Sequence, residues 1–172
     1  GDSYKDVSNS AELEQVSTQE NDDCNGSGCF NDIIVQAQAA DIANDIGGSG
    51  SYEDVSNSAE VEQDVKQKNE DCKDAPFCEN VVLNQEQSAV ISNAIGGSGS
   101  YEDVSNSAEV EQKAEQDNKD CNDGSICLNH ILPFQEQTAS ITNTNGGSSA
   151  DNYEEVSNSA EIEQKAEQEN KD

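Results

Sequence analysis

Tryptophan, methionine and arginine are absent from this chain of 172 residues, which has only 2 Pro, and aromatic residues make up 4% of it. Hydrophobic residues account for 31% of the sequence, too few for the apolar core of an ordinary domain of this length. Low hydrophobicity combined with high net charge is typical of disordered chains. Composition alone therefore predicts a disordered chain, and only a regular pattern in the sequence would argue against disorder.

Positive charge is scarce as well, because 8 Lys stand against 37 Asp and Glu and leave a formal net charge of −29. A nucleic-acid-binding surface needs a basic patch, so we expect no nucleic-acid partner. No apolar run approaches the roughly 20 residues of a transmembrane helix, so we expect no membrane insertion. The chain begins with Gly1 rather than Met, which favours a processed N-terminus.

Motifs of catalysis are missing too. The one histidine, His130, lies in an apolar stretch with no Cys or carboxylate at a fixed spacing, and we interpret it as a spectator. No order of Ser, His and Asp that is typical of hydrolases appears, and no phosphate-binding loop. We therefore predict that the protein is not an enzyme and needs no organic cofactor.

What the chain does contain is a repeat, in which Val-Ser-Asn-Ser-Ala-Glu-x-Glu-Gln occurs four times. The copies begin at Val7, Val55, Val104 and Val156. A tyrosine precedes each copy by three residues: Tyr4, Tyr52, Tyr101 and Tyr153. Repeats of this length indicate a stacked architecture. We divide the chain into three full repeats and a half repeat: 1–50, 51–99, 100–149 and 150–172.

The repeated stretch alternates with a period of two. In the third copy one face carries Val104, Asn106, Ala108, Val110, Gln112, Ala114, Gln116 and Asn118, and the residues between them are Ser, charged Glu or Asp, and Lys. Alternation over about fifteen residues predicts a β-strand. Ala, Glu, Gln and Lys favour a helix. The alternation nevertheless recurs in all four copies, so we predict a strand.

The inward face of this strand is polar, since it carries Asn and Gln beside Ala and Val. A buried amide without a partner costs free energy, whereas amides stacked on identical residues of neighbouring strands bond one another along a ladder. We therefore predict a ladder formed by Asn9, Gln15, Asn57, Gln63, Asn106, Gln112, Asn158 and Gln164.

The six cysteines fall into one pair per full repeat, always at the same place. We predict three disulfides within the repeats: Cys24–Cys29, Cys72–Cys78 and Cys121–Cys127. They indicate an oxidising, extracellular setting. Zinc binding is the alternative, and the spacing of four and five residues within the pairs, with no shared His, makes it weaker.

A second alternating strand follows each cysteine pair, with Gln, Ala, Ile and Asn on one face. If it folds back at the cysteines, Ala59 opposes Ile91 and Val61 opposes Ala89, so small residues meet large ones. The fold class that follows is all-β: tandem, disulfide-clasped β-arches that stack into a two-sheet, cross-β-like assembly. One extra residue in the third repeat, near Pro133, predicts a β-bulge.

We expect like strands to stack parallel and in register. Repeats 2 and 3 then place opposite charges side by side: Asp64/Lys113, Lys66/Glu115, Lys68/Asp117 and Glu70/Lys119. The same register stacks glutamates in two columns: Glu12, Glu60, Glu109 and Glu161, and Glu14, Glu62, Glu111 and Glu163. No Lys is expected to relieve these columns, so protons or divalent cations such as Ca²⁺ would. A solvated acidic face is the alternative.

The segment Asn-Ser-Ala-Glu-Val-Glu-Gln resembles the curlin repeat of bacterial functional amyloids, Asn-x-Ala-x-x-x-Gln. The matching positions are Asn9/Ala11/Gln15, Asn57/Ala59/Gln63, Asn106/Ala108/Gln112 and Asn158/Ala160/Gln164. The long arches, the cysteine pairs and the acidity look more like the amyloid-like sheath proteins of some filamentous methanogenic archaea. This resemblance implies a self-assembling extracellular coat or fibre at the cell surface, with copies of the same chain as partners.

The chain stops at Asp172, where the next cysteine pair would come, and we expect a neighbouring subunit to supply a partner for the strand of the half repeat. Two other functions stay open at this point. One is a monomeric acidic β-solenoid that acts as an adhesin or a cation-binding module, and the other is a disordered acidic chain.

Overall fold

A computed structural model describes residues 3–46, 51–95, 100–122, 124–145 and 154–171 of the chain. Most of the Gly/Ser linkers that separate the repeats, and Tyr153, lie outside these residues. Every regular element that is described is a β-strand, and the protein is all-β. The prediction of strands over the helix-favouring repeat is therefore confirmed.

Each full repeat contributes one very short strand and two long ones. The short strands are β1 (Ser3–Tyr4), β4 (Ser51–Tyr52) and β7 (Ser100–Tyr101). The strands before the cysteines are β2 (Ser8–Asn21), β5 (Ser56–Asn69), β8 (Ser105–Asn118) and, in the half repeat, β10 (Ser157–Asn170). The strands after them are β3 (Cys29–Ile46), β6 (Cys78–Ile95) and β9 (Cys127–Asn145).

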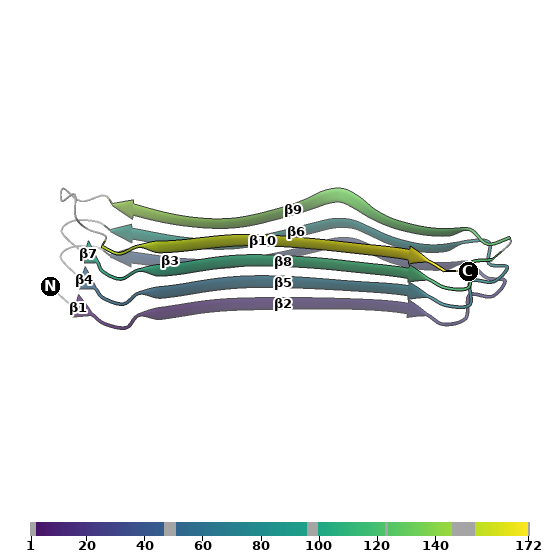
Figure 1. The fold of residues 1–172 in the computed structure, drawn as a ribbon, viewed down its shortest axis with the longest axis horizontal. Coiled ribbons are helices and arrows are strands. Elements are labelled where there is room, and N and C mark those ends of the chain that lie inside the picture. The colour runs from purple at the N-terminus through teal and green to yellow at the C-terminus, as the bar shows by residue number, and fades with distance from the viewer. Residues whose placement is uncertain (1–2, 47–50, 96–99, 123, 146–153, 172) are drawn as a thin grey trace.

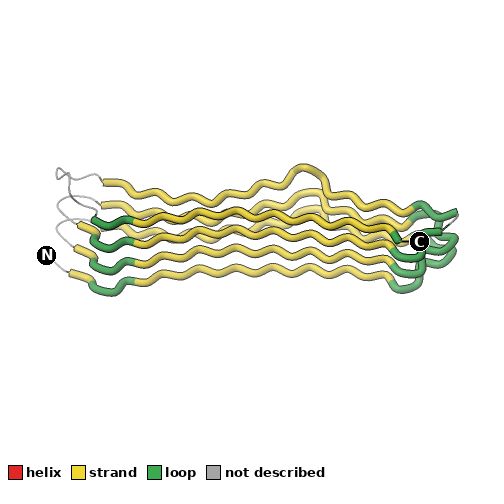
Figure 2. The backbone as a smooth tube through the Cα atoms, viewed as in Figure 1, coloured by secondary structure: helices red, strands yellow, loops and turns green. Residues whose placement is uncertain are grey.

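Like strands pair with like strands, so the repeats form two long parallel sheets and a small third one. The sheet orders are β10-β8-β5-β2, β3-β6-β9 and β1-β4-β7. Pairing is parallel, and β5 and β8 match residue for residue from Ser56 with Ser105 to Asn69 with Asn118. The two long sheets lie face to face and are joined at the cysteine turns (Figures 1 and 2). The predicted parallel, in-register stack of arches is confirmed within the chain.

The interior between the sheets is narrow because small and branched residues face each other. In β5 every second residue from Asn57 to Asn69 is buried, as the alternation predicts. At the centre, Ala59 and Val61 pack with Ala89 and Ile91 in one apolar cluster. This is the predicted opposition of small and large side chains, repeated at each level of the stack.

The arches turn sharply at the cysteine end. Asp71, Asp74 and Asp120 adopt left-handed φ angles of 53°, 54° and 58°, a conformation that Asp tolerates better than most residues. Backbone bonds between turns continue the ladder, for example from the Cys72 N–H to the Lys119 carbonyl at 3.1 Å. The turns are therefore stacked like the strands.

At the opposite end, a left-handed residue separates each short strand from the long strand that follows. Asp6, Asp54 and Asp103 have φ angles of 50°, 48° and 50°. The acidic residue before the repeated valine, which the sequence shows in every copy, thus makes a kink that sequence reasoning did not identify.

In β3 and β6 the alternation of buried and exposed residues shifts by one residue near the turn. Ile33 and Gln36 are both buried, whereas Ile34 and Val35 between them are 65% and 60% exposed. In β9 two residues oppose one of β6 between Val82 and Asn84, which confirms the bulge near Pro133 and appears as the outward bend of β9 in Figure 1.

Candidate functional site

The asparagines nearest the tyrosines form a continuous zigzag of amide bonds between the two sheets. Asn57 Nδ2 donates to Asn106 Oδ1 at 2.8 Å along its own sheet. Asn93, from the facing sheet, donates to the same Asn106 Oδ1 at 3.1 Å. The whole ladder comprises Asn9, Asn44, Asn57, Asn93, Asn106, Asn143 and Asn158. The predicted Asn ladder is confirmed, and it draws on both sheets.

A second asparagine ladder lies beside the cysteine turns. Asn69, which is fully buried, donates to Asn80 Oδ1 at 3.1 Å and to Asn118 Oδ1 at 2.9 Å. Its members are Asn21, Asn31, Asn69, Asn80, Asn118, Asn129 and Asn170. Sequence reasoning did not select these residues as a ladder, although Asn stands at these positions in every repeat.

The glutamines form further ladders within each sheet. Gln63 Nε2 donates to Gln15 Oε1 at 2.9 Å, and Gln112 Nε2 donates to Gln63 Oε1 at 3.1 Å. Gln164 donates to Gln112 at 2.8 Å and completes the predicted column. A parallel column that was not predicted comprises Gln19, Gln67, Gln116 and Gln168.

The two kinds of ladder run in opposite directions. Asn side chains donate toward β10, as Asn9 does to Asn57, while Gln side chains donate toward β2. Along the four-stranded sheet the Asn ladder therefore runs from an oxygen at β2 to an amide NH₂ at β10, and the Gln ladder runs from an amide NH₂ at β2 to an oxygen at β10. Donors at one edge match acceptors at the other.

The predicted glutamate columns lie on the outer face of the four-stranded sheet. Glu60 pairs with Glu109, and Glu62 with Glu111, in adjacent strands. Loss of hydration, followed by the charges of Glu111 and Glu14, raises the pKa of Glu62. The same cause, followed by the charges of Glu60 and Glu161, raises the pKa of Glu109. Like charges in register thus oppose the stack that the amides hold together.

One expectation about these columns is wrong, because a lysine does reach them. Lys165 Nζ lies 2.6 Å from a carboxylate oxygen of Glu163 and 3.8 Å from one of Glu111. Lys165 follows Glu163 by two residues, so both side chains stand on the same face of β10. The positive charge of Lys165 therefore partly neutralises the glutamates at the β10 end of the column.

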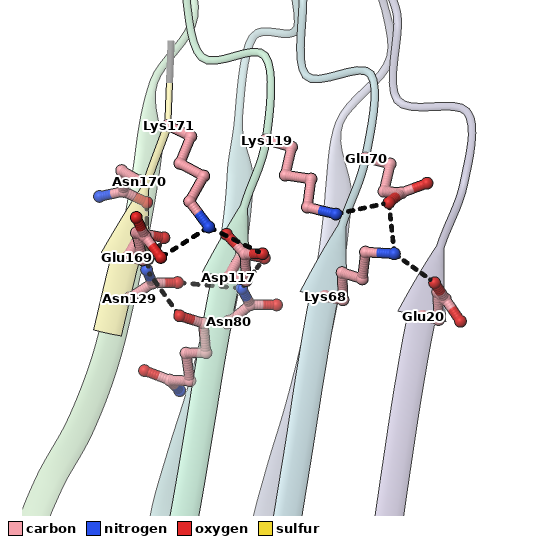
Figure 3. Close-up of polar contacts among 11 residues, drawn as sticks. Glu20, Lys68, Glu70, Asn80, Asp117, Lys119, Asn129, Glu169, Asn170 and Lys171 are labelled. Atoms are coloured by element: carbon pink, nitrogen blue, oxygen red, sulfur yellow. Dashed lines mark hydrogen bonds and ion pairs between the residues drawn. The ribbon is translucent and has the colours of Figure 1, made fainter. Parts of the chain in front are cut away.

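The opposite-charge columns occur in the predicted register. Ion pairs run both across strands, as from Lys68 to Glu20, and along a strand, as from Lys165 to Glu163. Of the four predicted pairs, Glu70 and Lys119 lie 3.0 Å apart, and Lys68 also contacts Glu70 and, at 2.9 Å, Glu20 (Figure 3). These lysines lower the pKa of Glu70. Lys113 bonds Glu115, two residues along, and lowers its pKa.

Carboxylate groups close enough to share a cation occur elsewhere than predicted. Among the described residues, Glu20, Asp22 and Glu70 bring oxygens within 4.8 Å of one another, and no trio from the glutamate columns does. Lys68 and Lys119 already neutralise part of this cluster. Binding of Ca²⁺ by the columns stays a prediction.

The three predicted disulfides are confirmed, each within one turn. They join Cys24–Cys29, Cys72–Cys78 and Cys121–Cys127. Sulfurs of consecutive turns also approach, since Cys24, Cys72 and Cys78 lie within 4.8 Å of one another. Paired cysteines in every turn indicate a non-reducing environment.

No model of a known protein family, no curated protein and no solved structure matches the chain. The part of the chain that the structure describes contains no helix of the length and apolar character needed to span a membrane. What the protein does must therefore be argued from the ladders, the columns and the sheet edges.

Replacement of Asn69 by Ala should destabilise the fold by about 2–4 kcal/mol, because it removes a fully buried amide that forms hydrogen bonds with the amides of four neighbouring asparagines. Asn84→Ala is the matched control, since Asn84 bonds only the exposed Glu86 at 3.1 Å. Urea unfolding of both variants measures the difference. Equal, small effects would contradict a stabilising role for the ladder.

The raised pKa values of Glu62 and Glu109 predict a pH dependence. A raised pKa means that the folded chain binds protons more tightly, so its stabilising contribution is present at low pH and lost as pH rises through the folded pKa. The double variant Glu62→Gln, Glu109→Gln should therefore be more stable than the native chain at neutral pH and less sensitive to pH above about 4.

Glu70→Gln is the control of opposite sign, because the pKa of Glu70 is lowered. Its contribution is present above the ordinary pKa of Glu, and its loss should destabilise the chain at neutral pH. Urea midpoints recorded across the acidic to neutral range at fixed ionic strength test both. Stabilisation by Glu70→Gln, or none by the double variant, would contradict the assignment.

Proposed function

We propose that the protein is a structural subunit that assembles with copies of itself into an extracellular sheath, coat or filament at the cell surface. The support comes first from the open edges of its sheets. All 14 residues of β10 are exposed, and neither β2 nor β10 contains proline. Proline in an edge strand hinders pairing with another chain, and a long edge strand without it can serve as a template for such pairing.

The observation that carries the proposal is the complementarity of the two edges of the four-stranded sheet. β2 of one copy, laid on β10 of another, places Asn9 on Asn158 and Gln15 on Gln164 in the register already used inside the chain. The Asn ladder then continues from donor to acceptor, and so does the Gln ladder in the reverse direction. Head-to-tail growth of a polar filament follows from this match.

The outer glutamates set a condition on this growth. At the same junction Glu12 meets Glu161 and Glu14 meets Glu163, which adds one like-charge contact to each column. Protons or divalent cations between the carboxylates would weaken this repulsion. Assembly is therefore favoured by mildly acidic pH or by Ca²⁺, and Ca²⁺ is the cofactor class that the proposed fibre would use.

The setting supports the same conclusion. A disulfide in every turn suits a protein that works in an oxidising environment outside the cell. The acidic outer face gives assembled fibres a high negative charge, which keeps them from clumping. A monomeric acidic solenoid that binds cations is the alternative, and the glutamate columns are the observation that favours it.

Gln164→Lys should abolish filaments while the chain still folds. In the single chain residue 164 is exposed, and a Lys there reaches water. At a junction between copies it would be enclosed between Gln112 of its own chain and Gln15 of the next copy, with its charge unpaired. Electron microscopy and sedimentation should show filaments of the native chain, with a strand repeat of about 4.8 Å in diffraction, and single chains of the variant.

Ser159→Lys is the matched control, since it adds the same charge to the outward face of the same strand. It should still assemble. A native chain that remains monomeric at acidic pH and with Ca²⁺, yet binds the ion, would replace this proposal with the cation-binding module. Filaments of unchanged yield from Gln164→Lys would contradict the junction.

A further inference from the structure

Three tyrosines stack in a column at the end of the arches opposite the disulfides. The ring centroids of Tyr4 and Tyr52 lie 4.8 Å apart with an angle of 18° between the rings. Those of Tyr52 and Tyr101 lie 5.2 Å apart at 24°. The short strands pair parallel and in register, so each of these tyrosines is opposite the tyrosine of the next repeat.

The backbone around Tyr4 and Tyr52 is held on both sides of the rings. The Glu53 N–H donates to the Tyr4 carbonyl at 2.9 Å, and the Ser3 and Ser51 hydroxyls lie 3.2 Å apart. An ion pair of 2.7 Å joins Lys5 to Glu53. These contacts hold the backbones of Tyr4 and Tyr52 side by side, so the two rings face each other.

These rings are also the side chains of the molecule that lose an electron most readily. The chain contains no Trp and no Met, and the structure has no free Cys, so the usual targets of side-chain oxidation are missing or already oxidised. Access decreases along the column, from Tyr4, which is 49% exposed, to Tyr101, which is 1% exposed.

We propose that this column is a site of oxidative cross-linking, at which Tyr4 and Tyr52 couple to dityrosine. A one-electron oxidant of the peroxidase class, supplied with hydrogen peroxide, removes one electron and one proton from each phenol. The two radicals join through a carbon ortho to each hydroxyl. The hydrogen on each of these carbons then moves to the phenol oxygen and restores the rings. Peroxide takes up the two electrons and two protons and leaves as two waters.

Such a bond differs in direction from the disulfides. Each disulfide closes a turn inside one repeat, with sequence separations of 5, 6 and 6, and none ties one repeat to the next. A Tyr4–Tyr52 bond crosses from one level of the stack to another. It depends on the fold of a single chain and not on assembly, so it goes beyond the proposed function.

The test uses the Gln164→Lys chain, kept dilute so that coupling between molecules is rare, and treated with peroxidase and hydrogen peroxide. We expect dityrosine fluorescence and, after proteolysis, a linked peptide pair that contains Tyr4 and Tyr52. Tyr52→Phe keeps the stacked ring but cannot couple, and it should lower the yield of Tyr4 cross-links by about tenfold or more, since proximity drives the reaction. Tyr101→Phe should leave the Tyr4–Tyr52 pair unchanged.

The same treatment in urea supplies the reference for an unfolded chain. A Tyr4–Tyr52 yield that does not fall in urea, or that rises in proportion to chain concentration, would overturn the proposal. So would a linked Tyr4 peptide of undiminished yield in Tyr52→Phe. Failure of the native chain to form filaments leaves this test unaffected, so the two proposals fail separately.

Discussion

Amide-to-amide hydrogen bonding between identical buried residues is the interaction on which the rest of the structure depends. Asn57, Asn69 and Gln63 lie in the interior with almost no exposure, where an unpaired amide costs roughly 1–3 kcal/mol. Only a parallel stack in register brings each of them against its own kind in the next repeat. The polar interior thus penalises every slipped or antiparallel arrangement, and a chain with little apolar side chain still has one favoured fold.

The register that pairs the buried amides also brings like charges together on the outer face of the sheet. Stacking Asn on Asn also stacks Glu60 on Glu109, and loss of hydration together with like charge raises the pKa of Glu109. Toward the cysteine end the sequence relieves this conflict by varying the outward residues, so that Lys119 stands beside Glu70. The interior amides therefore fix the register of the strands. The outer charges determine how readily another copy adds to the stack.

Much of this architecture could be predicted from the sequence, because a period of two repeated in every copy specifies both the strand and its face. Ala59 and Ile91, and the cysteine pairs, followed from folding one alternating strand on another. The contact of Lys165 with Glu163 was missed because it joins residues two apart on one strand, which a comparison between repeats does not examine. The kink at Asp54 was missed because a left-handed φ leaves no periodic signal. The phase shift between Ile33 and Gln36 was hidden in an apolar run without alternation.

Cysteine cross-linking tests the in-register parallel stack most directly. Ser58 and Ser107 are paired, exposed residues of β5 and β8, about 4.8 Å apart across the sheet, a separation that a disulfide spans. The account predicts that Ser58→Cys with Ser107→Cys oxidises rapidly to a bond within the chain, identified by peptide mapping, and that Ser58→Cys with Glu109→Cys, offset by two residues to about 8 Å, does not. Faster bonding of the offset pair, or of neither pair, would contradict the account.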